Sequence, residues 1–194
     1  TDFKNKTAPK ILEIGCAYGY IVHLLAKHFG GEAFGVEPSD EASAIATKHC
    51  DVKMYARNMH EVMELDESEK FDLIYYSHCL ENITNAPEAL KMISKLVKKD
   101  GKIMIETPNN EMHRSWHIYH PFCFNENSLS YMLENAGFRI DQSTISGRPK
   151  QFTGQIYLTL IGSPDDSVKA TARGKKSNVG LSNILWTLRL TKLL

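Results

Sequence analysis

The residues best suited to proton chemistry are gathered in one stretch, residues 112–124 (MHRSWHIYHPFCF), which combines histidines with aromatic side chains. His113, His117 and His120 fall within eight residues of one another. A neutral imidazole accepts a proton near neutral pH, so such a side chain can deprotonate a hydroxyl group. We expect His117 or His120 to act as a general base, with His78 as a third candidate.

A second group of residues, near the start of the chain, is suited to binding a ligand. Residues 10–14 (KILEI) are predicted to form a buried strand, and the chain then passes through Gly15 and Gly19 into a helix over 19–29. Glycines allow a tight turn and a close approach of the ligand, and the start of a helix offers unpaired N–H groups. Such a corner suits either a dinucleotide or S-adenosylmethionine, which has no phosphate.

The spacing within this corner favours S-adenosylmethionine. A dinucleotide-binding turn has the pattern G-x-G-x-x-G, whereas this chain has Gly15 and Gly19 with Ala17 at the position of the middle glycine. The carboxylate of Glu13 would repel a pyrophosphate and would attract an ammonium group. A dinucleotide-dependent oxidoreductase is therefore a less favoured alternative.

The segment from Glu13 to Gly19 resembles the signature of the class I S-adenosylmethionine-dependent methyltransferases, an acidic residue, one spacer and a glycine-rich turn. Further segments resemble the family at residues 37, 58–59, 71–74, 77–82, 98–109 and 127–138, so the resemblance covers residues 8–161. It implies a three-layer α/β, Rossmann-like methyltransferase fold with a seven-stranded, mostly parallel sheet and an antiparallel last strand. It also implies a set of cofactor-binding residues: Glu13, Gly15, Cys16, Ala17, Tyr18, Gly19, Tyr20, Glu37, Pro38, Asn58, Met59, Ser77 and His78.

The resemblance assigns different parts of the cofactor to different segments. The turn would cradle the methionine part, Glu37 would hold the ribose hydroxyls, residues 58–59 would border the adenine, and residues 77–78 would lie beside the sulfonium. Some relatives bind a metal through a Glu-x-x-Glu-His set after the fourth strand. Here that set reads His78, Glu81 and Asn82, which departs at two positions, so we expect no metal.

The methyl acceptor is the least determined part of the prediction. The late segments resemble methyltransferases of glycan, lipopolysaccharide and small-metabolite pathways, which implies O-methylation of a sugar hydroxyl or another small polar acceptor. The formal net charge is zero, so no nucleic-acid partner is expected. A non-catalytic S-adenosylmethionine-binding scaffold or regulatory domain of a larger protein is the alternative from another functional class.

Hydrophobic periodicity supplies the elements that would position these residues. We predict alternating strands and helices, with Ser39 as an N-cap, Asn125 or Asn127 as another, and the last strand antiparallel at or near the sheet edge. The predicted strands are 10–14, 33–37, 52–55, 71–76, 102–107, 138–145 and 154–161, and the predicted helices are 19–29, 40–49, 86–99 and one that ends at 135. The helix over 19–29 is expected to pack through Ile21, Leu24, Leu25 and Phe29, which share one face.

The composition changes near residue 162, which we take as the end of the methyltransferase domain, residues 1–162. Residues 163–180 are predicted to be a linker. Residues 181–194 are predicted to form an amphipathic, basic helix that packs on this domain, begins a further element or contacts a membrane surface or a partner. The four scattered cysteines suit reduced thiols in a cytoplasmic protein. Peripheral attachment to the inner face of the membrane is the alternative localisation.

Overall fold

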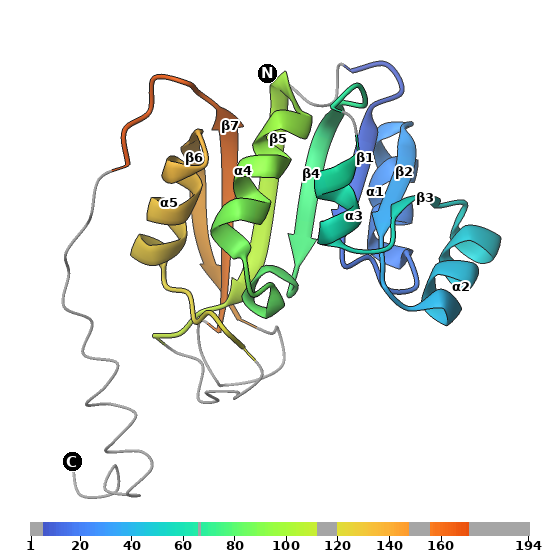
Figure 1. The fold of residues 1–194 in the computed structure, drawn as a ribbon, viewed down its shortest axis with the longest axis horizontal. Coiled ribbons are helices and arrows are strands. Elements are labelled where there is room, and N and C mark those ends of the chain that lie inside the picture. The colour runs from blue at the N-terminus through green and yellow to red at the C-terminus, as the bar shows by residue number, and fades with distance from the viewer. Residues whose placement is uncertain (1–5, 66, 112–119, 148–155, 171–194) are drawn as a thin grey trace, which may run out of the picture.

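The computed structural model describes residues 6–65, 67–111, 120–147 and 156–170. Within these ranges, helices cover a seven-stranded sheet (Figure 1). The strands are β1 (Lys10–Ile14), β2 (Glu32–Val36), β3 (Lys53–Ala56), β4 (Phe71–Ser77), β5 (Val97–Pro108), β6 (Phe138–Ser146) and β7 (Tyr157–Pro164). The helices are α1 (Tyr20–Phe29), α2 (Asp40–Cys50), α3 (Met59–Glu64), α4 (Ala86–Leu96) and α5 (Glu126–Asn135), with a 3-10 turn, η2 (Leu80–Asn82).

The strands are ordered β3-β2-β1-β4-β5-β7-β6, which confirms the predicted α/β class. The first five of these are parallel to one another, and β7 is antiparallel to both β5 and β6. The last strand is therefore antiparallel, as predicted, and lies one strand in from the edge with β6 outside it. The order reverses between β1 and β4, and ligands of open α/β sheets bind beyond the carboxyl ends of the strands at such a reversal.

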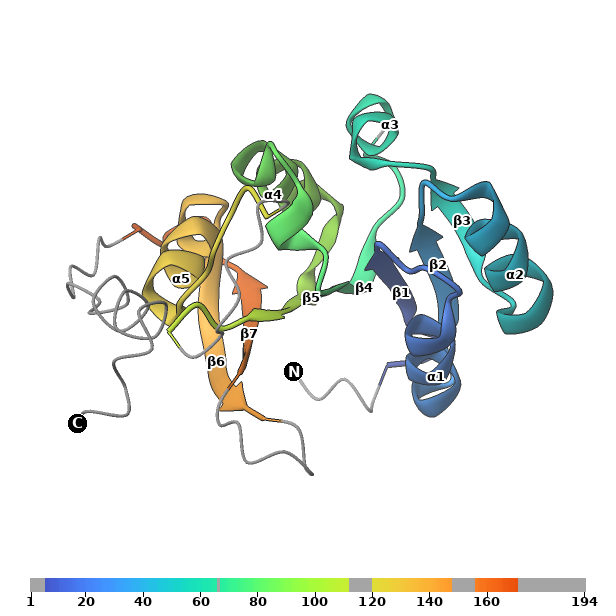
Figure 2. The ribbon, with the colours of Figure 1, turned by 90° about the horizontal axis from the view of Figure 1, so that it is seen from below.

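The two faces of the sheet carry two separate apolar cores, because strands in the middle of a parallel sheet are buried on both sides. One core joins Leu12, Ile74 and Ile103 to α3, α4 and α5. The other joins Ile11 and Leu73 to α1 and α2. Figure 2 shows α4 and α5 on the opposite side of the sheet from α1.

The buried face of α1 differs from the one that the sequence predicts. Of the predicted apolar residues, Leu25 and Phe29 pack against the smaller core, whereas Ile21 and Leu24 are 43% and 63% exposed. Val22 and Ala26 are the buried residues of α1. Smaller side chains at the contact allow the helix to lie close to β1 and β2, which leaves Ile21 and Leu24 outside.

Asp72 ties the segment before β1 to the sheet. Its carboxylate, which is almost fully buried, accepts hydrogen bonds from the side chains of Lys6 and Lys98, each at 2.8 Å, and from the backbone N–H of Lys10 at 2.9 Å. Burial opposes ionisation of Asp72, but these hydrogen bonds outweigh it and lower the pKa of the carboxyl group. Asp72, the second residue of β4, thus has a structural role, because it attaches the start of the chain to the sheet.

One helix boundary and one whole helix differ from the prediction. Helix α4 ends at Leu96 rather than residue 99, because Val97 already pairs with Phe71 of β4. The register then shifts before the pairing of Leu73 with Lys102. Helix α3 was not predicted at all, although Asn58 caps its start, and six residues are too few to show a clear helical period.

Helices α2 and α5 both begin at N-cap residues that the sequence predicted. The Ser39 side chain accepts a hydrogen bond from the N–H of Ala42, which confirms it as the N-cap of α2. Of the two asparagines proposed for α5, Asn125 is the cap, and it forms a capping box with Ser128.

The carboxyl-terminal part of the chain is described only as far as residue 170, so the predicted helix over 181–194 lies outside it. Strand β7 continues through Ser163 and Pro164, two positions that the prediction assigned to the linker. Among the described helices, none combines the length and apolar character that crossing a bilayer requires.

Candidate functional site

The turn between β1 and α1 lies at the carboxyl end of β1, beside the point where the strand order reverses (Figure 1). The N–H groups of Gly15 and Cys16 donate to the carbonyl oxygen of Val36 at 2.8 and 3.1 Å. The N–H of Gly19 donates to the carbonyl oxygen of Cys16 at 2.8 Å and closes the turn. The predicted ligand corner is therefore formed by backbone contacts that join it to the end of β2.

Both glycines of this turn occupy positions that a side chain could not share. Gly15 and Gly19 have φ angles of 74° and 76°, in the left-handed region. A Cβ atom on Gly15 would lie 2.6 Å from the Sγ of Cys79, and one on Gly19 would lie 2.7 Å from a methyl group of Val52. Ala17, between them, also has a positive φ of 46°. The close packing of Cys79 on Gly15 brings the segment after β4 against the turn.

Glu13 lies beneath the turn, with 2% of its surface exposed. Its Oε2 atom accepts a hydrogen bond from the N–H of Val22 at 3.1 Å, one of the unpaired donors in the first turn of α1. Burial raises the pKa of this carboxyl group to about 7, although the hydrogen bond from Val22 opposes the shift. Glu13 therefore joins the strand to the helix and can carry a charge near neutral pH.

Glu37 is held in place by backbone groups of two loops, the turn after β1 and the loop after β2. Its Oε2 atom accepts from the N–H of Ala17 at 3.0 Å, and its Oε1 atom accepts from the N–H of Ser39 at 2.9 Å. Each carboxylate oxygen keeps a further acceptor position, so the group can also accept hydrogen bonds from two neighbouring hydroxyl groups. Pro38 lies between Glu37 and Ser39 in the loop after β2.

The two tyrosines of the turn are exposed at its surface. Tyr18 and Tyr20 are 47% and 59% exposed, and their ring centroids lie 6.3 Å apart. Large exposed aromatic rings beside a ligand-binding turn are suited to covering part of a bound molecule.

The residues predicted to border the adenine lie at the start of α3. The Oδ1 atom of Asn58 accepts from the N–H groups of His60 and Glu61 at 2.9 and 3.0 Å, so it caps the helix. A contact between Asn58 and an adenine base would therefore use its amide nitrogen. Met59 is partly buried and packs against the larger core.

The thiols close to the turn are unsuited to nucleophilic chemistry. Burial, together with nearby carboxylates, raises the pKa of Cys16 and of Cys79 to about 12. A thiolate, not a thiol, is the nucleophile. Both cysteines are thus packing residues of the corner.

His78 follows β4 in a left-handed conformation, with φ of 50°, and its N–H donates to the carbonyl oxygen of Glu106 at 2.9 Å. Its Nε2 atom lies 3.4 Å from Oε1 of Glu106, and its Nδ1 atom lies 3.8 Å from Oε1 of Glu81. The edge of the imidazole meets the ring of Tyr157, with centroids 4.9 Å apart and planes at 76°. The structure therefore places one of the three predicted base candidates between two carboxylates, just after the predicted contact residue Ser77.

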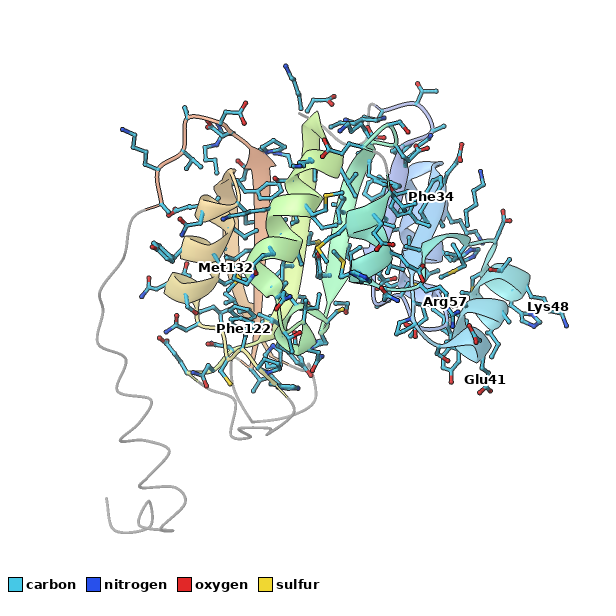
Figure 3. All side chains as sticks on the ribbon, viewed as in Figure 1. Phe34, Glu41, Lys48, Arg57, Phe122 and Met132 are labelled. Atoms are coloured by element: carbon cyan, nitrogen blue, oxygen red, sulfur yellow. The ribbon has the colours of Figure 1, made fainter. Side chains whose placement is uncertain are left out.

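His120 lines a small cavity on the other side of Glu81. The cavity has a volume of about 10 Å³, roughly the space of one water molecule, and its wall includes Thr107, Phe122 and Phe124. Thr107 donates to Oε2 of the buried Glu81 at 3.2 Å. Figure 3 shows Phe122 at the lower end of the sheet, where the parallel strands end.

The remaining candidates from residues 112–124 fall partly outside the described chain. His113 and His117 lie outside the described residues, so the assignment of His117 as a base stays a prediction. In the part of the chain that is described, no group of three His, Cys, Asp or Glu side chains has a metal-binding arrangement.

Sequence reasoning missed Glu106, Tyr157 and Thr159. Glu106 was included in the segment that resembled the family, and its place at the end of β5 was the available signal. Tyr157 and Thr159 carried no signal, because they reach His78 only through the pairing of β5 with β7.

Comparisons with known proteins agree with this geometry. A family model described as "Methyltransferase domain" matches residues 2–143. Ubiquinone biosynthesis O-methyltransferases from Bradyrhizobium diazoefficiens and Coxiella burnetii are each 28% identical to this chain, over 109 and 103 residues. These matches cover 55% and 51% of this chain and 41% and 43% of the relatives, so the chain spans less than half the length of the curated relatives it matches.

Solved structures share the fold at low sequence identity. A TehB-like SAM-dependent methyltransferase from Corynebacterium glutamicum has a TM-score of 0.63 and 18% identity, with 84% of each chain covered. A putative S-adenosylmethionine-dependent methyltransferase from Listeria monocytogenes has a TM-score of 0.67 and 12% identity, with 85% of this chain and 93% of that chain covered.

Proposed function

The chain belongs to the methyltransferase domain family, and on this premise we propose that it transfers a methyl group from S-adenosylmethionine to a hydroxyl group of a small acceptor. The observation that carries the proposal is the turn of Gly15 and Gly19 with the carboxylate of Glu37 held across it. The turn admits a ligand close to the backbone, and the carboxylate can accept both hydroxyls of a ribose.

The residues of the corner fit the proposed cofactor. Glu13 is a buried carboxyl group close to the turn, and an ammonium group nearby would favour its charged form. Glu37, which accepts from the N–H of Ser39, would border the ribose of the cofactor, and the amide of Asn58, at the start of α3, would border the adenine. The cofactor supplies an activated methyl group on a sulfonium, and the protein must position the acceptor in line with it.

The curated relatives indicate which type of acceptor atom receives the methyl group. Their names specify O-methylation, which supports oxygen as the methylated atom in this chain. The sequence predicts a sugar or another small polar compound as the acceptor, and either type can supply a hydroxyl oxygen to the methyl group. The non-catalytic scaffold has no support from these relatives, which are named as enzymes.

Cofactor binding is tested by titration calorimetry with S-adenosylhomocysteine. We expect wild-type protein to bind, and Glu37→Gln to bind about tenfold more weakly, because a neutral amide is a poorer partner for the ribose hydroxyls. Glu41→Gln is the matched control, because it removes the same charge from an exposed position of α2, at the outer margin of the molecule (Figure 3). Equal weakening by both variants would contradict the role of Glu37.

Methyl transfer is tested separately with labelled S-adenosylmethionine and two acceptors, 3,4-dihydroxybenzoate as a phenol and methyl glucoside as a sugar. Labelled product from either one supports the proposal, and the identity of the methylated compound separates the two acceptor classes. Binding of NADH without binding of S-adenosylhomocysteine would overturn the proposal in favour of an oxidoreductase. Binding of S-adenosylhomocysteine with no transfer to hydroxyl compounds, including those of a cell extract, would favour the scaffold.

A further inference from the structure

Three polar residues form a row across the carboxyl end of β4, the carboxyl half of β5 and the amino end of β7. Ser77 pairs with Glu106, and Glu106 pairs with Thr159, so their side chains share one face of the sheet. The larger core and helices α4 and α5 occupy the opposite face, through Ile105 and Leu160. Figure 2 shows that no described helix covers the row's face over β5 and β7.

Glu106 is fixed from two directions within this row. Thr159 donates its hydroxyl hydrogen to Oε2 at 3.3 Å, and the imidazole of His78 lies 3.4 Å from Oε1. The hydrogen bond from His78 lowers the pKa of Glu106, although partial burial opposes it. Glu106 is therefore an anion next to the histidine at neutral pH. Among the described residues, Glu81, with its Oε1 3.8 Å from Nδ1, and Tyr157 also face the ring.

We propose that Glu106, braced by Thr159, is the positioning residue that holds the His78 imidazole as the general base of methyl transfer, and that the acceptor is a phenol. The inference rests on the proposed function. A carboxylate that accepts a hydrogen bond from the N–H of one ring nitrogen leaves the other nitrogen as the base and stabilises the imidazolium that forms. His78 reaches the reaction centre because its neighbour Cys79 packs directly on Gly15 of the cofactor turn.

The choice of a phenol follows from the strength of the base. A phenol has a pKa of about 10, within a few units of an imidazole, so proton transfer in the transition state is effective. The hydroxyl of a sugar is a much weaker acid, and an imidazole would assist it less. The aromatic ring of Tyr157 beside His78 adds a surface on which a flat acceptor can pack.

The reaction step balances in atoms and charge. The acceptor oxygen forms a bond to the methyl carbon, while the bond from that carbon to sulfur breaks and its electron pair remains on sulfur. The hydroxyl proton passes to Nδ1 of His78, whose Nε2–H is held by Glu106. The resulting imidazolium then releases its proton to water, so no other reactant is needed.

The first test follows the imidazole directly and needs no acceptor. NMR titration of imidazole nitrogens in the wild-type protein, with His78→Gln used to assign the signal, gives the midpoint of His78 protonation. We expect Glu106→Gln to move this midpoint to lower pH by about one unit, and Thr159→Val to move it less in the same direction. Glu41→Gln should leave it unchanged. An unchanged midpoint in Glu106→Gln would overturn the positioning role.

The second test uses turnover of 3,4-dihydroxybenzoate with the same variants. We expect kcat to fall about 100-fold in His78→Gln and about tenfold in Glu106→Gln, with the affinity for S-adenosylhomocysteine unchanged. The pH dependence of kcat should shift with the NMR midpoint in Glu106→Gln. Loss of turnover in His120→Gln with full activity in His78→Gln would overturn the assignment of the base, and preferential methylation of methyl glucoside would overturn the phenol. Failure of the wild-type protein to bind S-adenosylhomocysteine would instead refute the proposed function.

Discussion

Replacement of Gly15 by alanine tests whether the cofactor turn and the segment after β4 are packed as closely as the structure shows. The φ angle of 74° is unfavourable for alanine, at a cost of about 1–2 kcal/mol. The added Cβ would lie 2.6 Å from the Sγ of Cys79 and 3.0 Å from its Cβ, and relief of such an overlap costs about 1–3 kcal/mol. We therefore expect Gly15→Ala to lower the free energy of unfolding by about 3 kcal/mol.

The assay is urea denaturation followed by circular dichroism, with two further variants to separate the contributions. Gly30 also has a positive φ, 66°, but a Cβ there would meet nothing within 4 Å, so Gly30→Ala should cost only about 1 kcal/mol of backbone strain. In a Cys79→Ala background the sulfur is absent, and Gly15→Ala should cost about 1–2 kcal/mol less than in the wild type. If Gly15→Ala costs no more than Gly30→Ala, the contact with Cys79 is not tight and the reasoning fails.

Two further predictions concern buried carboxyl groups. Asp72→Asn should lower the free energy of unfolding at pH 7 by about 3 kcal/mol, because Lys6 and Lys98 lose a buried partner. Since the pKa of Asp72 is lowered by folding, its contribution is present above the ordinary value of 3.8 and is lost in more acidic solution, so wild type and variant should converge there in denaturation curves. The pKa of Glu13 is shifted in the opposite direction by folding, from 4.5 to about 7. Wild-type stability should therefore fall by up to about 3 kcal/mol as the pH rises between these values. Glu13→Gln should remove that fall. A pH-independent difference in either comparison would contradict the assignment.

The local structures that the sequence predicted correctly are made of neighbouring residues. The strand over residues 10–14 has the predicted bounds, and Gly15 and Gly19 form the turn that follows it. Ser39 caps α2 through its own side chain. Each of these features depends on contacts between residues close in the chain, or on conformations that particular residue types favour.

The errors arise where a distant segment decides the outcome. Leu24 is on the apolar side of a helical wheel, yet the small contact face around Val22 and Ala26 is the one that lies on the sheet. Helix α4 stops at Leu96 because the next residue pairs with β4, which helix propensity does not record.

The sequence by itself determined the fold class and the cofactor corner, because a strand, a glycine turn and a helix in succession are encoded locally. Only the tertiary structure decided which side chains surround His78. Glu106 and Thr159 reach it through the registers of β4 with β5 and of β5 with β7. Those registers depend on the packing of the whole sheet, since a shift by one residue would turn each of these side chains to the opposite face.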